Sequence, residues 1–210
     1  MEGVKETYPA LWQGMHSMAS TQIRNRGTVT GNICNAVPSA DTAPALLVYD
    51  ALVVITSESG TRQVPVSEFF TGVCRTVLKA DELVQEILVP KPVKGTHSIY
   101  YKYAIRNALD LAMIGVAANV LLDAGKVKDV KLALGAVAVT PRRANKTEAL
   151  LLGKALDEEL IEEAAQVASQ EDCAPISDIR ASADYRREMV RIHVRDALRF
   201  AMESGKGEAE

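Results

Sequence analysis

The sequence predicts an α+β protein, in which a first group of helices and strands precedes a three-stranded antiparallel sheet with helices on one side. Residues 51–57 form a β-branched run that is typical of a buried strand. Residues 113–122 and 127–139 flank an Asp-Ala-Gly-Lys turn, which indicates a long hairpin. Residues 183–203 repeat apolar side chains at helical spacing, so we expect an amphipathic helix there.

The N-terminal residues predict two helices on either side of a glycine-containing turn. Apolar side chains at near-helical spacing predict a helix over residues 6–19. A polar turn at residues 27–32 holds two glycines, and no run of large side chains shields its backbone. A short helix is expected over residues 42–50, with Asp41 at its N-cap and Pro44 in its first turn.

A pair of strands and a short helix are expected next. The strand at 51–57 turns at a Ser-Gly pair and returns as a partner strand at residues 62–66. Ser67 is expected to cap a short helix at residues 68–70, which Gly72 ends. Another strand over residues 83–89 stops at two prolines.

The segment at residues 90–95 is the best internal boundary, because proline, glycine and lysine suit a connector between two parts. We therefore expect one domain over residues 1–91 and a second over residues 96–204. The second begins with a strand at residues 98–104, which joins the hairpin to make three strands.

Helices are expected over residues 146–152 and 157–169, the second with acidic residues that complement the dipole of its first turn. On the last helix, one face carries Val190, Val194, Ala197 and Ala201. Another face carries Arg187, Arg191, Arg195 and Arg199. We expect this arginine row to be a solvated face rather than a partner surface, because exposed charges contribute little energy.

Composition excludes several classes of protein. A net charge of −3 over 210 residues gives no reason to expect nucleic-acid binding. No apolar run approaches the ~18 residues of a membrane span. The first residues lack the apolar core of a signal peptide, so we expect a cytoplasmic location.

Cysteine and histidine are too dispersed to indicate a metal site. Cys34, Cys74 and Cys173 have no C-x-x-C spacing, so we expect neither zinc nor an iron–sulfur cluster in this chain. The histidines are equally scattered. No Ser-His-Asp, Cys-His or paired-carboxylate pattern is recognisable, so no catalytic residue is assigned.

The glycine segment at residues 27–32 has the chemistry of a nucleotide site. Backbone amides that a ligand can approach suit phosphate and carbonyl oxygens, and the carboxylate of Asp41 suits sugar hydroxyls. The spacing matches neither G-x-G-x-x-G nor a phosphate loop, and a bare turn between two helices is the competing interpretation.

Residues 20–36, followed by residues 38–41, resemble the second flavin loop of the FAD-binding medium subunit of molybdenum hydroxylases. That family includes the xanthine dehydrogenases and the aerobic carbon monoxide dehydrogenases. The likeness continues at residues 64–72, 81–83, 87–90, 101–103 and 176–187, in the order of the family. This resemblance implies two domains. The first is the second lobe of an FAD-binding domain, and the other is like the C-terminal domain of carbon monoxide dehydrogenase flavoprotein.

The resemblance implies an oxidoreductase subunit in which FAD passes electrons from an iron–sulfur small subunit to an outside acceptor. Molybdopterin would lie on a large subunit. The loop residues that would face the flavin and its diphosphate are Thr28, Thr30, Gly31 and Asn32. Asp41 would bind a sugar hydroxyl, Val84 would touch the adenine side, and Lys102 would lie near the carbonyl edge of the flavin. Spacing alone favours a simple helix cap for Asp41 and a solvent-facing strand residue for Lys102.

This chain departs from the family pattern at two points. Thr30 and Gly31 stand where the family has two adjacent glycines. The first FAD lobe, with its A-G-G-T-type loop, has no counterpart, so we expect a partial FAD site. Either a separate chain supplies the other lobe, or this chain is a fragment or a truncated gene product, or flavin binding has been lost. Helix 6–19 and strand 51–57 would then expose apolar surface and favour self-association. The alternatives are a truncated assembly subunit without flavin and an unrelated nucleotide-binding module.

Overall fold

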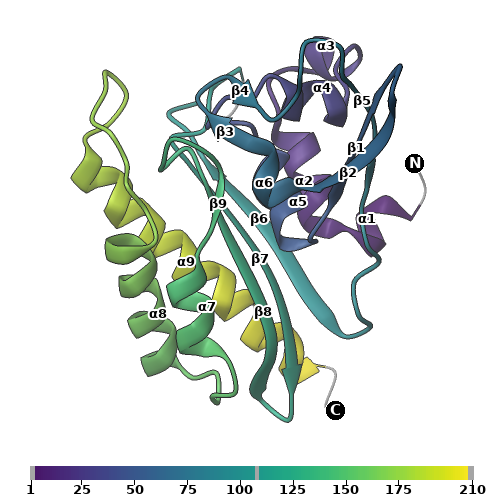
Figure 1. Cartoon of the computed structure of the whole chain (residues 1–210). Coiled ribbons are helices and arrows are strands. Elements are labelled where there is room, and N and C mark those ends of the chain that lie inside the picture. Colours follow the sequence, from purple (N-terminus) through teal and green to yellow (C-terminus); the bar gives the residue numbers. More distant parts are fainter. Residues whose placement is uncertain (1–2, 107–108, 208–210) are drawn as a thin grey trace.

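The computed structural model describes residues 3–106 and 109–207, which form the α+β arrangement in Figure 1. The helices are α1 (Val4–Thr7), α2 (Pro9–Ser17), α3 (Thr21–Arg24), α4 (Val29–Cys34), α5 (Ala43–Val48), α6 (Val66–Phe69), α7 (Asn145–Leu151), α8 (Glu158–Glu171) and α9 (Ala183–Gly207). The strands are β1 (Leu52–Ser57), β2 (Gly60–Pro65), β3 (Phe70–Gly72), β4 (Arg75–Thr76), β5 (Leu83–Leu88), β6 (Thr96–Tyr103), β7 (Ile114–Asp123), β8 (Lys126–Gly135) and β9 (Arg142–Arg143). Among these residues no helix is long and apolar enough to cross a membrane.

An antiparallel sheet in the order β6-β7-β8-β9 forms the middle layer of the molecule. Helices α7, α8 and α9 cover one face, and α2 and α5 lie against the other (Figure 1). Side chains alternate between the faces, so Val116 joins the core under α8 and α9, whereas Ala117 joins the core under α5. The sheet is therefore buried on both sides.

The three predicted strands of this sheet are confirmed as β6, β7 and β8. The sequence did not indicate β9, which adds two residues beside Ala133 and Leu134. Two residues are too few to show a period, so only pairing with β8 defines this strand.

The predicted single helix over residues 6–19 is wrong, because the chain forms α1 and α2 with a break between them. The break is at Tyr8, whose φ and ψ are −132° and 59°. Tyr8 precedes Pro9, and the proline ring disfavours the helical conformation in the residue before it. Pro9 itself starts α2, where its missing N–H costs nothing.

The glycine segment is also more helical than predicted. Only Gly27 and Thr28 precede α4, and Gly31 lies inside its first turn. The hydroxyl of Thr28 accepts the amide of Gly31 at 2.9 Å and caps the helix. Local glycine and β-branched residues disfavour helix, so this cap and the burial of Ile33 decide the conformation.

Helix α5 begins one residue later than expected. Thr42 is its N-cap, without a side-chain cap bond, so the prediction that Asp41 caps this helix is wrong. Pro44 in the first turn is confirmed. Every residue of α5 is buried, because the helix packs against the central sheet and against α2 and α6.

The smaller sheet has the order β2-β1-β5 and confirms the strands predicted in this region. The run from Val53 to Ile55 is at most 4% exposed, so the expected apolar surface on this strand is absent. Ser67 does not cap α6, which follows Pro65 without a side-chain cap bond. Gly72 pairs with Arg75 in the hairpin of β3 and β4.

The arginine row on α9 is only partly the solvated face predicted, because three of its four side chains are half-buried against α8. Arg199 donates to Glu158 of α8 at 2.6 Å, and Arg191 contacts Glu162 one turn further along α8. Arg187 donates to the carbonyl oxygen of Ser169 at 2.7 Å, near the C-terminus of α8. Arg195 instead contacts its neighbour Asp196. The apolar face of α9 packs on the sheet as expected, so Arg187, Arg191 and Arg199 hold α8 alongside.

Arg186 anchors the start of α9 to the central sheet. Its side chain is buried, and Nη1 donates to the carbonyl oxygens of Met113 at 2.6 Å and Ala136 at 3.3 Å. Nη2 donates to Asp178 at 2.9 Å. The backbone amide of Arg180, together with the Arg186 guanidinium, lowers the pKa of Asp178 to about 2.

We expect the Asp178→Asn substitution to lower the free energy of unfolding above pH 5, because the charge that pairs with Arg186 is lost. A depressed carboxyl pKa stabilises the fold above the unfolded value of 3.8 and loses this effect as the pH falls towards about 2. Urea unfolding of the unsubstituted protein and of the variant, measured from pH 5 down towards pH 2, should therefore show a difference in unfolding free energy that shrinks as the pH falls. Asp129→Asn, at an exposed position on β8, is the control. A difference that is independent of pH would contradict the assignment.

Candidate functional site

The N-terminus of α4 presents backbone amides beside a hollow. Thr28 satisfies the amides of Gly31 through its hydroxyl and of Asn32 through its carbonyl, at 2.9 and 3.0 Å. The amides of Val29 and Thr30 head the first turn, where a helix offers no internal acceptor. A side-chain carbon at Gly31 would meet the Thr28 hydroxyl at 3.0 Å, and Gly31 has an ordinary negative φ. The glycine therefore keeps the surface of this turn open.

The hollow has a volume of about 460 Å³. Its lining residues are Val4, Trp12, Met15, His16, Met18, Arg24, Gly27, Thr28, Val29 and Thr42. Most of this lining is apolar, with a few polar groups, which is the usual composition of a small-molecule site. Sequence reasoning missed His16 and Arg24.

Trp12 and His16 form a stacked pair, with ring centroids 4.7 Å apart and planes 14° apart. Their separation of four residues on α2 is the signal that places both rings on the same helix face. Arg24 donates to the carbonyl oxygen of Met18 at 2.7 Å, so its guanidinium is held at the wall of the hollow.

Asn32 ties α4 to the start of α5. Its Oδ1 accepts the hydroxyl of Thr42 at 2.6 Å, and its Nδ2 lies 3.4 Å from the sulfur of Met18. The side chain of Asn32 therefore supports the wall of the hollow.

Asp41 and Lys102 form a buried ion pair, with Nζ 2.9 Å from Oδ2 and side chains only 12% and 7% exposed for the lysine and the aspartate. Lys102 also donates to the carbonyl oxygen of Ser17 at 3.0 Å. The Tyr100 hydroxyl donates to Oδ1 of Asp41 at 3.1 Å. Lys102 is thus not solvent-facing, and the two residues are adjacent although 61 positions separate them.

Burial raises the pKa of Asp41, while Lys102 and Tyr100 act in the opposite direction. Burial raises the pKa of Tyr100 well above its ordinary value, and the charge of Asp41 adds to this, so the phenol remains a donor. Because desolvation is the largest effect on Asp41, the pair costs energy to bury. Removing one partner would leave the other as an unpaired buried charge.

Lys102 also lines a second, smaller space of about 240 Å³ with Ser17, Tyr103, Ala104, Arg106, Leu109 and Asp110. Val84 is half-buried on β5, which packs beside α4. The structure therefore brings Thr28, Thr30, Gly31 and Asn32 together on α4 and joins Asp41 to Lys102. Val84 lies on a separate element, strand β5, beside α4.

The described part of the chain holds no group of three or more His, Cys, Asp or Glu residues placed to bind a metal ion. Cys34, Cys74 and Cys173 carry free thiols, and burial raises the pKa of Cys34 and Cys173.

Comparison with known proteins identifies the family of this chain. Residues 1–92 match the FAD binding domain in molybdopterin dehydrogenase, and residues 99–201 match the CO dehydrogenase flavoprotein C-terminal domain. The xanthine dehydrogenase FAD-binding subunit of Escherichia coli O157:H7 is 36% identical over 203 residues, which are 96% of this chain and 69% of that protein. The chain belongs to the FAD-binding medium subunits of the xanthine dehydrogenase and carbon monoxide dehydrogenase family.

Other members of the medium-subunit family are similar throughout. The carbon monoxide dehydrogenase medium chain of Hydrogenophaga pseudoflava is 34% identical over 198 residues, covering 94% of this chain and 68% of that one. A solved carbon monoxide dehydrogenase from Hydrogenophaga pseudoflava has a chain with a TM-score of 0.92 and 34% identity, over 97% of this chain and 70% of that one. The resemblance recognised in the sequence is confirmed, and these relatives are subunits of oxidoreductases.

We expect Asp41→Asn and Lys102→Met each to lower the free energy of unfolding by about 3 kcal/mol, because each leaves an uncompensated buried group. The double variant should lose clearly less than the sum, since it removes both partners. Urea unfolding of the four proteins measures this coupling.

The exposed pair of Lys128 and Asp123, whose side chains are 62% and 70% exposed, provides the control. The same cycle there should show coupling below about 0.5 kcal/mol. Additive losses at Asp41 and Lys102 would show that the two side chains do not depend on one another.

Proposed function

We propose that this chain is the FAD-binding electron-transfer subunit of a molybdenum hydroxylase complex. The observation that carries the proposal is the hollow at the amide-bearing end of α4, in a chain that matches medium subunits over 96% of its length. Residues 1–91 would supply one lobe of the FAD site, and residues 96–204 the flavoprotein C-terminal domain. Bound FAD would take electrons from an iron–sulfur subunit and give them to an outside acceptor.

The first turn of α4 fits the diphosphate of FAD in both geometry and charge. The amides of Val29 and Thr30 can donate to phosphate oxygens, and the helix N-terminus favours the negative charge. Thr28 and Asn32 keep this turn in shape, and Gly31 allows close approach. Thr30 adds a hydroxyl donor where the family has a second glycine.

Asp41 and Lys102 retain hydrogen-bonding capacity while bound to each other. Tyr100 and Lys102 use one acceptor position on each carboxylate oxygen of Asp41, so a further position on each could accept a sugar hydroxyl. Lys102 uses two of its three hydrogens, and the third could donate to the carbonyl edge of the flavin. Val84 would offer apolar contact to the adenine side.

Other polypeptides would complete the assembly. An iron–sulfur small subunit and a molybdopterin large subunit are the proposed partners, with the molybdenum and the clusters held there. The complementary FAD lobe would come from outside these 210 residues, since the E. coli relative extends beyond the part matched, which is 69% of it. One turn of amides satisfies only part of a diphosphate, which agrees with a partial site.

The isolated 210-residue chain should bind FAD weakly or not at all. Half of the contacts must overcome the same association entropy as a full site. Calorimetric titration of FAD into the chain, with and without a polypeptide that carries the complementary lobe, measures this. Binding at micromolar or tighter affinity without that polypeptide would refute the partial site. An assembled complex that contains no flavin would instead favour the assembly-subunit alternative.

Gly31→Val should lower the FAD content of the assembled complex by about tenfold or more, because a branched side chain would stand where the cofactor approaches. The added carbon would also meet, at 3.0 Å, the Thr28 hydroxyl that caps α4, so the urea midpoint is measured as well to separate loss of flavin from loss of fold. Flavin released by acid from the purified complex is the measurement. Gly72→Ala, whose added carbon would make ordinary contacts, is the control. Unchanged flavin content in Gly31→Val would show that α4 is not at the diphosphate.

A further inference from the structure

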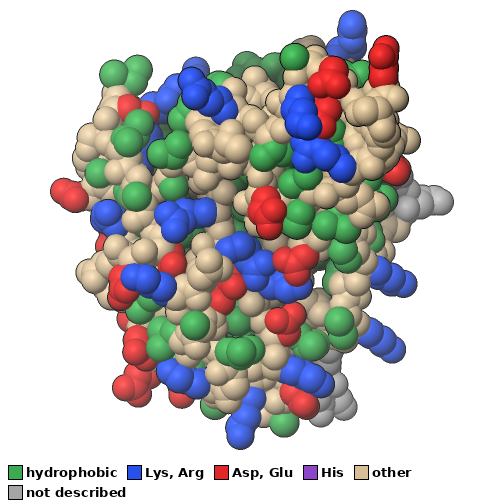
Figure 2. All heavy atoms as spheres, in the orientation of Figure 1, with side chains coloured by type: hydrophobic (Ala, Val, Ile, Leu, Met, Phe, Trp, Pro, Cys, Tyr) green, Lys and Arg blue, Asp and Glu red, His purple; other side chains and the backbone are tan. Residues whose placement is uncertain are grey.

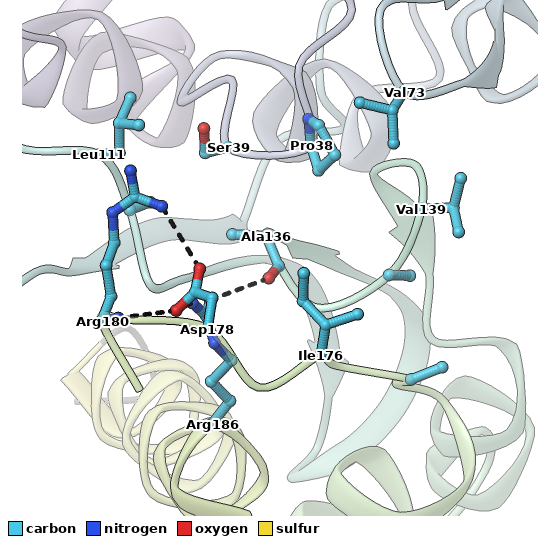
Figure 3. Close-up of a pocket in the computed structure, with 13 residues that line it drawn as sticks. Pro38, Ser39, Val73, Leu111, Ala136, Val139, Ile176, Asp178, Arg180 and Arg186 are labelled. Carbon is cyan, nitrogen blue, oxygen red and sulfur yellow. Dashed lines mark hydrogen bonds and ion pairs between the residues drawn. The ribbon is translucent and has the colours of Figure 1, made fainter. Parts of the chain in front are cut away.

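A third hollow, of about 240 Å³, lies where five stretches of the chain meet, and large apolar side chains stand around it (Figure 3). We name as the apolar rim Val73, Leu111, Val139, Ile176 and Ile179. The first four line the hollow, and Ile179 lies between the lining residues Asp178 and Arg180. The side chain of Ile179 is 100% exposed, and that of Ile176 is 71% exposed. Exposed apolar clusters of this kind mark interaction surfaces.

The segments that carry the apolar rim are fixed to one another through their backbones. The amide of Ala136 donates to Pro38 at 2.8 Å, and that of Ala174 donates to Val137 at 2.8 Å. The amide of Cys74, beside Val73, donates to Ala36 at 2.9 Å. The rim is therefore set before a partner arrives, and binding would lose little conformational entropy.

Polar groups beneath the rim hold Ile179 in solvent. Asp178 accepts the backbone amides of Arg180 at 2.9 Å and Ala181 at 3.2 Å, which closes a tight turn around Ile179. Arg186, buried below, fixes the same carboxylate. A buried guanidinium and an ionised carboxylate thus keep one large apolar side chain fully outward, which is the arrangement of an interface anchor.

The apolar rim is bordered by positive charge. Arg180 lines the hollow, exposed Arg75 shares the hairpin of Val73, and exposed Arg142 ends the connection that carries Val139. Asp178 is the carboxylate among the lining residues, and it pairs with Arg186, with backbone amides and, at 3.4 Å, with the guanidinium of Arg180. The four arginines Arg75, Arg142, Arg180 and Arg186 still outnumber this one carboxylate. Figure 2 shows hydrophobic and basic side chains, with an acidic one among them, along the upper left edge, where Figure 1 places the loop before α9.

We propose that the apolar rim and its arginines bind an acidic surface of another subunit, with Ile179 as the central apolar anchor. This inference rests on the proposed function, because only a subunit of a complex has such a partner. Charge selects the occupant: a two-fold contact between copies of this chain would place Arg75, Arg142 and Arg180 near the same arginines of the second copy. An acidic protein surface satisfies them, and the interface would weaken as salt increases.

The test uses the complex purified from the native host, with the photoreactive amino acid p-benzoylphenylalanine in place of Ile179. We expect light to join this position to a peptide of another subunit whose surface is rich in Asp and Glu. The same probe in place of Leu83, which is 72% exposed on β5, should give no such product. Cross-links to a second copy of this chain, to the polypeptide that carries the complementary FAD lobe, or to no protein would overturn the proposal.

Substitutions test the same surface without a probe. Ile179→Ser and the pair Arg75→Glu with Arg142→Glu should each lower the amount of that subunit retained on the tagged chain by about tenfold. Leu83→Ser should retain it fully. All of these positions are exposed, so the urea midpoint should stay unchanged. Full retention of the subunit by the variants would refute an acidic protein partner. Vesicles of phosphatidylcholine and phosphatidylglycerol test an acidic lipid surface in parallel. If the unsubstituted chain binds these vesicles and the variants lose that binding while they retain the subunit, the acidic protein partner is likewise refuted.

Flavin content separates this inference from the proposed function. The apolar rim lies outside the residues that line the hollow at α4, so Ile179→Ser should leave the FAD content of the chain with its complementary lobe unchanged. A cross-link at position 179 in a complex without flavin would leave the interface standing and refute the FAD function. A flavin-loaded complex without a cross-link at position 179 would support the FAD function and refute the interface.

Discussion

Burial of the central sheet on both faces constrains most of this structure. Because side chains alternate along a strand, sequence neighbours on β6 serve different layers: Tyr101 packs towards α9, whereas Tyr100 faces the N-terminal helices. A polar side chain that points into either layer must find a partner there. Tyr100 and Lys102 therefore both end at Asp41, on the connection between α4 and α5. The geometry of the candidate site follows from this requirement.

Arginines join the layers at their edges. Arg143 on β9 donates to Glu148 of α7 and to Asp50, just beyond α5, so one guanidinium links helices on opposite faces of the sheet. Arg186 links the start of α9 to the sheet, because it donates to Met113 before β7 and to Ala136 after β8. A planar guanidinium carries five donors in a fixed fork and can therefore satisfy several acceptors on different elements at once. The layers are thereby held in one arrangement.

One short connection borders both hollows. Thr42 lines the hollow at α4, whereas Pro38 and Ser39 line the hollow beside the loop before α9. The chemistry of the two walls differs, since the first turn of α4 and two aromatic rings stand at the first, and apolar side chains with arginines at the second. Asp41, near the end of the connection, is bound by two residues of β6, so the wall between the hollows is fixed to the central sheet.

The sequence by itself determined the fold class, most strands, the amphipathic last helix and the family. These features depend on local periodicity, turn residues and ordered motifs, all of which one chain displays. Tertiary structure alone decided that Asp41 pairs with Lys102, that the burial of Ile33 favours helix in a glycine segment, and that three arginines of α9 hold α8. The physical reason is that each outcome depends on a partner distant in sequence or on burial, and neither leaves a local pattern.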